Sequence, residues 1–212
     1  MRRYIAGFAI VGTLLLSGCT FGSSTEKELS NALTDMNNAE EDYRGLQEEL
    51  NSLEKSEQAT FNEMMNLTQE QKDELKTKLG EVEESLEKRL EQIKDEETSM
   101  EKAKETVSSF DKVIEKAEGD TKKEVEELKK AINSRYDNHS IFIEEYKKLS
   151  ERQKNLYAKI SDEEADITEL QDLVGEVNKQ NDVVKESIEL FNESTVKVND
   201  IKEKLFNDLE KE

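Results

Sequence analysis

The chain has 212 residues, of which 39% are charged and none is proline, and its formal net charge is −20. A composition rich in charge and free of proline favours long helices over a loop-rich fold. The acidity argues against bulk binding to nucleic acid, anionic lipid or anionic wall polymers, and the single cysteine, Cys19, excludes a disulfide framework.

The N-terminal segment, residues 1–18, has the features of a secretory signal peptide. Two arginines precede an apolar run from 4 to 16, which is shorter than the ~20 apolar residues of a membrane-spanning helix. The following segment, Leu16-Ser17-Gly18-Cys19, resembles a bacterial lipobox. This resemblance implies cleavage between Gly18 and Cys19 and a diacylglyceryl group on the Cys19 sulfur, with N-acylation left open. The alternative is a signal anchor with an incidental cysteine, which the charge, length and small residues together disfavour.

The predicted mature chain begins with a short tether. Removing residues 1–18 takes away two arginines and no acid, so the mature net charge is −20 − 2 = −22. Residues 19–25 comprise the lipidated Cys19 and a Gly/Ser-rich stretch that reaches only ~20 Å when extended. We therefore expect the folded part, residues 26–212, to start close to the bilayer.

A first helix is predicted over about 26–67. Its apolar residues recur mostly at steps of three and four, the pattern of one face of a bundle helix: Leu29, Ala32, Met36, Ala39, Tyr43, Leu46, Leu50, Leu53, Met64 and Leu67. Gly45 within it costs about 1 kcal/mol relative to alanine. Thr68 and Gln71 match a capping box, which indicates a turn; the alternative is a stutter in one continuous helix.

Three further helices follow, over about 69–118, 121–160 and 162–210. Gly119-Asp120 is expected to join the second and third, and Ser161 with Glu164 forms a second capping box. Their apolar seams keep the same rhythm. Polar residues interrupt the seams at Arg89, Glu96, Arg135, His139, Gln153, Asn181, Thr195 and Lys202.

These four segments predict an all-α fold, an elongated antiparallel up-and-down four-helix bundle that resembles a coiled coil and is ~60–75 Å long. The turn at Gly119-Asp120 should lie beside the tether and the C-terminus, near the membrane. The turns at Thr68 and Ser161 should lie at the far end. Lys122 and Lys123 would then lie near the lipid headgroups.

Counting residues along each helix from the predicted turns shows which residues share a height, and this predicts a polar layer inside the bundle. Glu96, His139 and Asn181 should meet at one height, with Arg135 above them. Buried polar groups of this kind cost stability but fix helix register, so we expect His139 to have a registering role. The competing interpretation of His139 is a metal ligand with Glu96 and Glu189. A single histidine favours the first interpretation.

The sequence offers no signature of catalysis. It lacks a Ser-His-Asp set, a Gly-rich phosphate loop, an HExxH pattern and an EF-hand pattern. We expect no catalytic residues, no cofactor and no metal. Nearly continuous apolar seams also leave little room for a ligand cavity.

Taken together, the chain resembles the YkyA-like family of Gram-positive bacteria, described as putative cell-wall-binding lipoproteins. The likeness rests on the lipobox, on Ser134-Arg135-Tyr136-Asp137, on Glu145-Tyr146-Lys147-Lys148 and on Phe191-Asn192. It implies a lipid-anchored protein on the extracytoplasmic face of the cell membrane, and it supplies no catalytic residues.

Two functions are expected from this sequence. The first is a non-enzymatic envelope spacer or interaction protein, held to the bilayer by the Cys19 lipid, whose partner is peptidoglycan, another wall component or an envelope protein. The alternative is a ligand-binding or metal-assisted lipoprotein with a small pocket near His139. Neither involves nucleic acid.

Overall fold

The computed structural model describes residues 24–68, 70–162 and 164–210. The predicted signal peptide, the Gly18–Cys19 cleavage site and nearly all of the tether lie outside the described residues. The described part is all-α and contains no strand. No helix in it is both long enough and apolar enough to cross a bilayer. Its elements are α1 (Ser24–Ala39), α2 (Glu41–Met64), α3 (Lys72–Glu105), the 3₁₀ helix η1 (Thr106–Ser109), α4 (Phe110–Lys116), α5 (Gly119–Ile160) and α6 (Ile167–Leu209).

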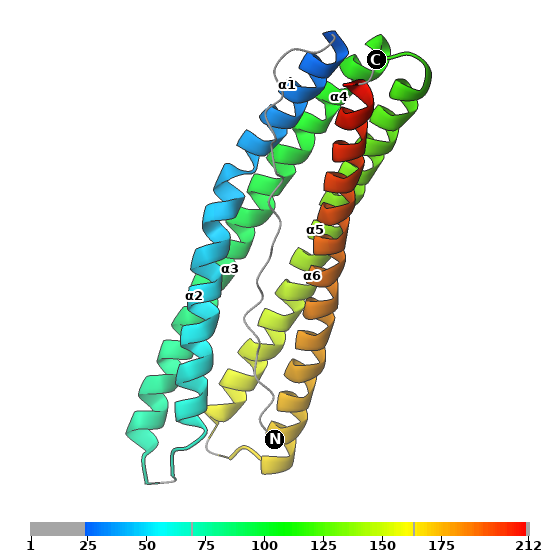
Figure 1. Ribbon diagram of the computed structural model, residues 1–212. Coiled ribbons are helices and arrows are strands. Elements are labelled where there is room, and N and C mark those ends of the chain that lie inside the picture. Colours follow the sequence, from blue (N-terminus) through cyan, green and yellow to red (C-terminus); the bar gives the residue numbers. More distant parts are fainter. Residues whose placement is uncertain (1–23, 69, 163, 211–212) are drawn as a thin grey trace.

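These elements form four antiparallel rods, which confirms the predicted fold class (Figure 1). The rods are α1 with α2, α3 with η1 and α4, then α5, then α6. The start of α1, the α4–α5 turn and the C-terminal end of α6 share one end of the bundle, here called the termini end. The α2–α3 and α5–α6 turns share the other, here called the far end. The predicted pairing of turns is therefore confirmed. With 42 residues, α5 is roughly 63 Å long at ~1.5 Å per residue.

Helix boundaries differ from the predicted ones in ways that have local causes. The chain does turn after α2, but α3 starts at Lys72 rather than 69, with Gln71 at the N-cap. The backbone N–H of Thr68 donates to the Gln71 side chain at 3.0 Å, so this half of the capping box closes the turn before the helix. The predicted Ser161–Glu164 box is not used. Asp166 caps α6 instead, accepting from the N–H groups of Thr168 and Glu169.

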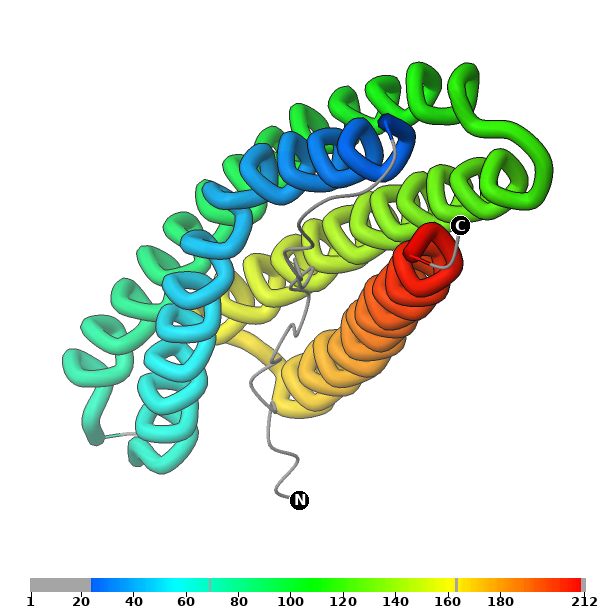
Figure 2. Tube along the Cα trace, turned by 45° about the horizontal axis from the view of Figure 1, so that its top comes forward, coloured from blue at the N-terminus to red at the C-terminus, as the bar shows by residue number. Residues whose placement is uncertain are grey.

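Two of the predicted helices are interrupted. The first is broken at Glu40, whose φ and ψ are −89° and 5°, and the second passes through the 3₁₀ segment η1 before α4. Segments α1, η1 and α4 pack against one another. Figure 2 shows α1 bending away from the line of α2 at this point.

The four rods pack as two close pairs. Helix α5 lies along α6 and α2 lies along α3, while α3 and α5 join the pairs. By contrast, α1 and α2 make few close backbone contacts with α5 or α6. That side of the bundle is therefore wide, and it is spanned by long side chains.

The apolar core consists of two clusters rather than one. The first occupies the termini end and includes Leu33, Phe110 and Leu128. The second extends toward the far end and includes Leu86 and Leu149. Polar residues lie between them, and these are described in the next section.

Gly119 gives the sharpest test of the turn at the termini end. Its φ is +58°, in the left-handed region where a Cβ costs about 1–2 kcal/mol. It opens α5 after an extended Glu118. We expect Gly119→Ala to lower the melting temperature by a few degrees, since 1 kcal/mol corresponds to ~2–4 °C at this size.

The matched control is Gly175→Ala in the middle of α6. A Cβ there meets nothing within 4 Å, and alanine is the better helix former by about 1 kcal/mol, so its melting temperature should rise. Calorimetry on both variants checks the opposite signs. An unchanged melting temperature for Gly119→Ala would contradict the assigned turn.

Candidate functional site: buried polar layers and a surface groove

The polar residues that interrupt the seams meet in three layers inside the bundle. Heptad spacing returns a side chain to the same face of a bundle helix, and the residues of these layers recur at that spacing on three of the rods. The spaced sets are Glu40, Gln47 and Glu54; Arg89 and Glu96; and His139, Tyr146 and Gln153. The layers are numbered here from the termini end.

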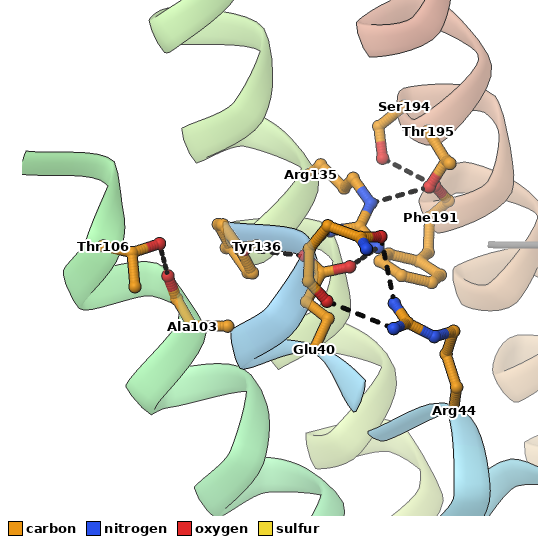
Figure 3. A network of polar contacts seen from close by, with 10 residues as sticks. Glu40, Arg44, Ala103, Thr106, Arg135, Tyr136, Phe191, Ser194 and Thr195 are labelled. Carbon is orange, nitrogen blue, oxygen red and sulfur yellow. Dashed lines mark hydrogen bonds and ion pairs between the residues drawn. The ribbon is translucent and has the colours of Figure 1, made fainter. Parts of the chain in front are cut away.

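The first layer is a buried ion pair with two further hydrogen bonds and one cation–ring contact (Figure 3). The Arg135 guanidinium donates to both carboxylate oxygens of Glu40, at 2.6 and 3.1 Å, and its Nε donates to Thr195 Oγ1 at 2.9 Å. The Tyr136 hydroxyl donates to the same carboxylate at 2.6 Å. Arg135 also lies 4.9 Å from the centroid of the Phe191 ring. Arg135 and Glu40 are 0% and 1% exposed, so this layer ties the α1–α2 rod to α5 and α6.

Glu40 reaches this partner from the break between α1 and α2. Arg44 spans the break, donating to the carbonyl oxygen and to the side-chain oxygen of Asn37, each at 3.2 Å. These bonds hold the helix on both sides of Glu40. The break is thus stabilised locally and coupled to the buried pair.

The second layer consists of Gln47, Glu96 and His139. The Nε2 atom of His139 lies 2.7 Å from one oxygen of Glu96, and the Gln47 amide donates to the other. Glu96 has no exposed surface and His139 is 2% exposed. Three aromatic rings surround the imidazole, those of Tyr43, Phe142 and Phe191, with centroids 5.3–5.8 Å from its own.

Burial raises the pKa of Glu96, while its bonds to His139 and Gln47 act in the opposite direction. Burial, with the Glu96 charge nearby, also raises the pKa of Tyr43 well above its ordinary value. The second layer lies between the two apolar clusters and separates them.

Comparison with the predicted layer gives one confirmation and two corrections. Glu96 and His139 do meet. Asn181 does not join them, and Gln47 supplies the third polar side chain. A turn near Ser161 would place His139 level with Val183, but His139 packs against Phe191, eight positions later, because α6 does not start until Ile167. Arg135 belongs to the separate first layer.

The metal interpretation of His139 finds no support in this geometry. Glu189, its proposed co-ligand, is exposed on α6 while His139 is buried. Within residues 24–68, 70–162 and 164–210, no three His, Cys, Asp or Glu side chains are placed to hold a metal ion. The expected small pocket near His139 is not seen either, since the imidazole is enclosed by the three rings.

The third layer is the largest and centres on Arg89. Its guanidinium donates to both oxygens of Glu57, at 2.8 and 2.7 Å, to the Tyr146 hydroxyl at 2.7 Å and to Gln153 at 2.9 Å. The Tyr146 hydroxyl in turn donates a hydrogen bond to Glu54 at 2.8 Å. Tyr157 donates to Glu57 at 2.7 Å. The layer thus joins α2, α3 and α5.

Burial and the nearby charges shift the pKa values of Glu54 and Arg89 in this layer. Burial raises the pKa of Glu54, against the lowering effects of Arg89 and Tyr146. Burial would lower the pKa of Arg89, but Tyr146, Glu57 and Glu54 together raise it above its ordinary value. Arg89 therefore stays charged, and the raised pKa of Glu54 makes this carboxylate easier to protonate than an exposed glutamate.

These layers are suited to structural work rather than to chemistry on a substrate. Their acids and bases are bonded to one another, and all except the half-buried Glu54 are withdrawn from solvent. Arg89, Gln153 and Thr195, which interrupt the apolar seams in the sequence, all belong to them. Lys202 is buried on α6, and its ammonium donates to Asn199 at 3.3 Å.

A solvent-open groove lies outside the layers, between α2 and α3. The residues that line it are Glu41, Asp42, Gly45, Leu46, Asp95, Thr98, Ser99 and Lys102. None of them was predicted as a site residue. The only signal in the sequence was Gly45, a glycine inside a strongly helical segment.

The apolar residues Phe61, Met64 and Met65, near the end of α2, are divided between core and surface. Met64 is buried and belongs to the second apolar cluster, against which Phe61 packs. Met65 is exposed at the far end.

Comparison with known proteins gives one family and one fold neighbour. A family model described as YkyA, putative cell-wall binding lipoprotein, matches residues 24–208. A conserved protein of unknown function from Staphylococcus aureus, with a 1.6 Å crystal structure, is similar with a TM-score of 0.69 and 17% identity. The match covers 89% of this chain and 98% of that one, and at this identity it shows the fold alone. No curated protein matched the sequence.

The first layer predicts strong coupling between Glu40 and Arg135. Removing one partner of a buried pair leaves an uncompensated charge, which costs about 3–5 kcal/mol. We expect Arg135→Met to destabilise by that amount, and the Glu40→Met/Arg135→Met double variant to be more stable than Arg135→Met alone. Urea unfolding of the four proteins of the cycle measures the coupling.

A surface pair two residues away supplies the control. Lys104 donates to Asp137 at 2.7 Å with both side chains largely exposed, and such pairs contribute ~0–1 kcal/mol. The cycle of alanine substitutions at Lys104 and Asp137 should therefore show little coupling. Equal coupling in the two cycles would contradict the role given to the first layer.

The third layer predicts a pH dependence of stability. Because the pKa of Glu54 is raised in the folded state, its ionisation opposes folding as the pH rises through that pKa. Glu54→Gln is neutral at every pH, so it should melt higher than the wild type at pH 7. The difference should shrink as the pH falls through the folded pKa toward the ordinary value of a glutamate. A difference that is constant between pH 7 and pH 4.5, the ordinary pKa of a glutamate side chain, would rule this out.

Proposed function

Because the chain belongs to the YkyA family of putative cell-wall binding lipoproteins, we propose that it is a membrane-anchored, non-catalytic rod that binds the cell wall. In this proposal Cys19 carries the lipid, and the bundle lies on the extracytoplasmic face of the membrane. The wall component is the partner, and the rod sets its distance from the bilayer.

The observation that carries this proposal is the position of the start of α1. Ser24 lies at the termini end of the bundle (Figure 1), only five positions after Cys19. Five extended residues reach ~18 Å at most. A lipid on Cys19 would therefore hold the termini end near the membrane and direct the far end outward, by roughly the 63 Å length of α5.

Charge supports one class of wall partner over another. The mature chain at −22 repels polyanions, so an anionic wall polymer is a poor partner. The glycan and peptide meshwork of the wall is a better one. The same charge keeps neighbouring anchored rods apart.

The closed polar layers support a role without catalysis. Their titratable groups are committed to one another across the wide side of the bundle. In the proposed function they keep a long, narrow molecule in one shape, as a spacer requires.

Sedimentation with purified sacculi tests wall binding. We expect the lipidated protein in detergent micelles to sediment with sacculi, and to do so more fully after anionic polymers are stripped from them, because repulsion is then relieved. Recovery of all the protein in the supernatant from both preparations would contradict wall binding.

The Cys19→Ala variant separates anchoring from wall binding. Without a lipid it should leave the membrane fraction of cells or accumulate as unprocessed precursor. It should still sediment with sacculi, since the bundle is unchanged. A processed variant that stays with the membrane would show that something other than the lipid holds the protein.

A further inference from the structure

The groove between α2 and α3 lies beside the second layer, on the outside of the bundle. Asp95 directly precedes the buried Glu96, and Gly45 and Leu46 directly precede Gln47. The backbone of α2 and α3 that forms the groove is therefore held in place from inside by the second layer. A fixed backbone keeps the surface side chains of the groove in constant positions.

Gly45 keeps this groove open. It lies inside α2, where a glycine costs stability relative to alanine. The fold does not require it, since its φ is not positive and an added Cβ would meet nothing within 4 Å. What the missing side chain leaves free is the space of the groove itself.

Ser99 gives the groove an unused polar group. Ser99 is 7% exposed, and its hydroxyl has no hydrogen-bond partner among the residues that the structure describes. A buried hydroxyl without a partner is unfavourable. The neighbouring Thr98 hydroxyl is different, because it donates to the Lys94 carbonyl at 2.9 Å.

The charges around the groove are mostly negative. Glu41, Asp42 and Asp95 are exposed carboxylates on its two sides, and Lys102 is its one ammonium group. These carboxylates do not form a set that could hold a metal ion. Carboxylates spread along a groove suit an extended organic cation, whose N–H groups can reach more than one of them.

We propose that this groove binds a peptide bearing a free amino group, with the ammonium among the carboxylates and the peptide lying over Gly45. The lysine in the groove offers a counterpart to a peptide carboxylate. This inference deepens the proposed function and rests on it, because the ligand would be the peptide part of the wall. It also explains how a chain at −22 associates with a wall that contains anionic polymers.

Calorimetric titration with soluble muropeptides tests the groove directly. The muropeptides are released from sacculi by cleavage of the glycan, and half are acetylated on their free amines. We expect binding of the untreated muropeptides by the lipidated protein in micelles, at least tenfold weaker binding after acetylation, and weaker binding as salt is raised.

Two matched glycine variants locate the site. Gly45→Gln places a side chain in the groove, and we expect it to weaken muropeptide binding at least tenfold. Gly80→Gln makes the same change at another exposed helical glycine with free space around it, and binding should be unchanged. Both changes favour the helix, so melting temperatures should hold or rise. Ser99→Ala should weaken binding without an added side chain.

The outcomes divide cleanly. Equal binding by the Gly45→Gln and Gly80→Gln proteins would overturn the groove as the site, and equal binding of acetylated muropeptides would overturn the amine as the recognised group. If Gly45→Gln still sediments fully with sacculi, wall binding stands and the groove fails. If the wild type fails to sediment with sacculi, the proposed function itself fails.

Discussion

The carboxylates on the α1–α2 rod, buried against cations and hydroxyls of the other helices, are the interaction on which the rest of this bundle depends. The backbone of α1 and α2 stays apart from α5 and α6, so short apolar side chains cannot close that side. Long polar side chains of this rod form hydrogen bonds with other rods instead: Glu40 and Glu57 with α5, and Gln47 with α3. The three layers act as cross-links along the length of a narrow molecule.

These cross-links are weak contributors to stability and strong contributors to uniqueness. Removing two charges from water offsets most of their attraction, so a buried ion pair is often no better than an apolar pair of similar size. Repetitive apolar seams, however, pack almost equally well after a shift of one heptad. A layer such as Gln47, Glu96 and His139 does not, because a shifted register would leave a buried carboxylate without its partners. In a protein proposed to act as a spacer, one length and one shape matter more than extra stability.

The sequence predicted the fold because the seams, the missing proline and the turn signals all agree. It predicted that Glu96 meets His139 because the heights of both residues are counted from the same tight turn at Gly119. It placed Asn181 wrongly because a capping box at Ser161 suggested an immediate start of α6, whereas Asp166 delays it to Ile167. It missed Glu40 and Gln47, since a polar residue in an acidic helix is expected to face solvent until its buried partner is known. Their seven-residue spacing was the one available signal.

The central claim, that the polar layers fix the register, can be measured by replacing the second layer with leucine. In the Gln47→Leu/Glu96→Leu/His139→Leu protein, spin labels on cysteines introduced at the exposed positions Glu48 of α2 and Lys185 of α6 report the distance across the wide side. The account predicts a single narrow distance distribution in the wild type. In the variant it predicts an equal or higher melting temperature with a broadened or multiple distribution. A variant that melts lower and keeps the single narrow distance would show that the layer supplies stability rather than register, and would contradict the account.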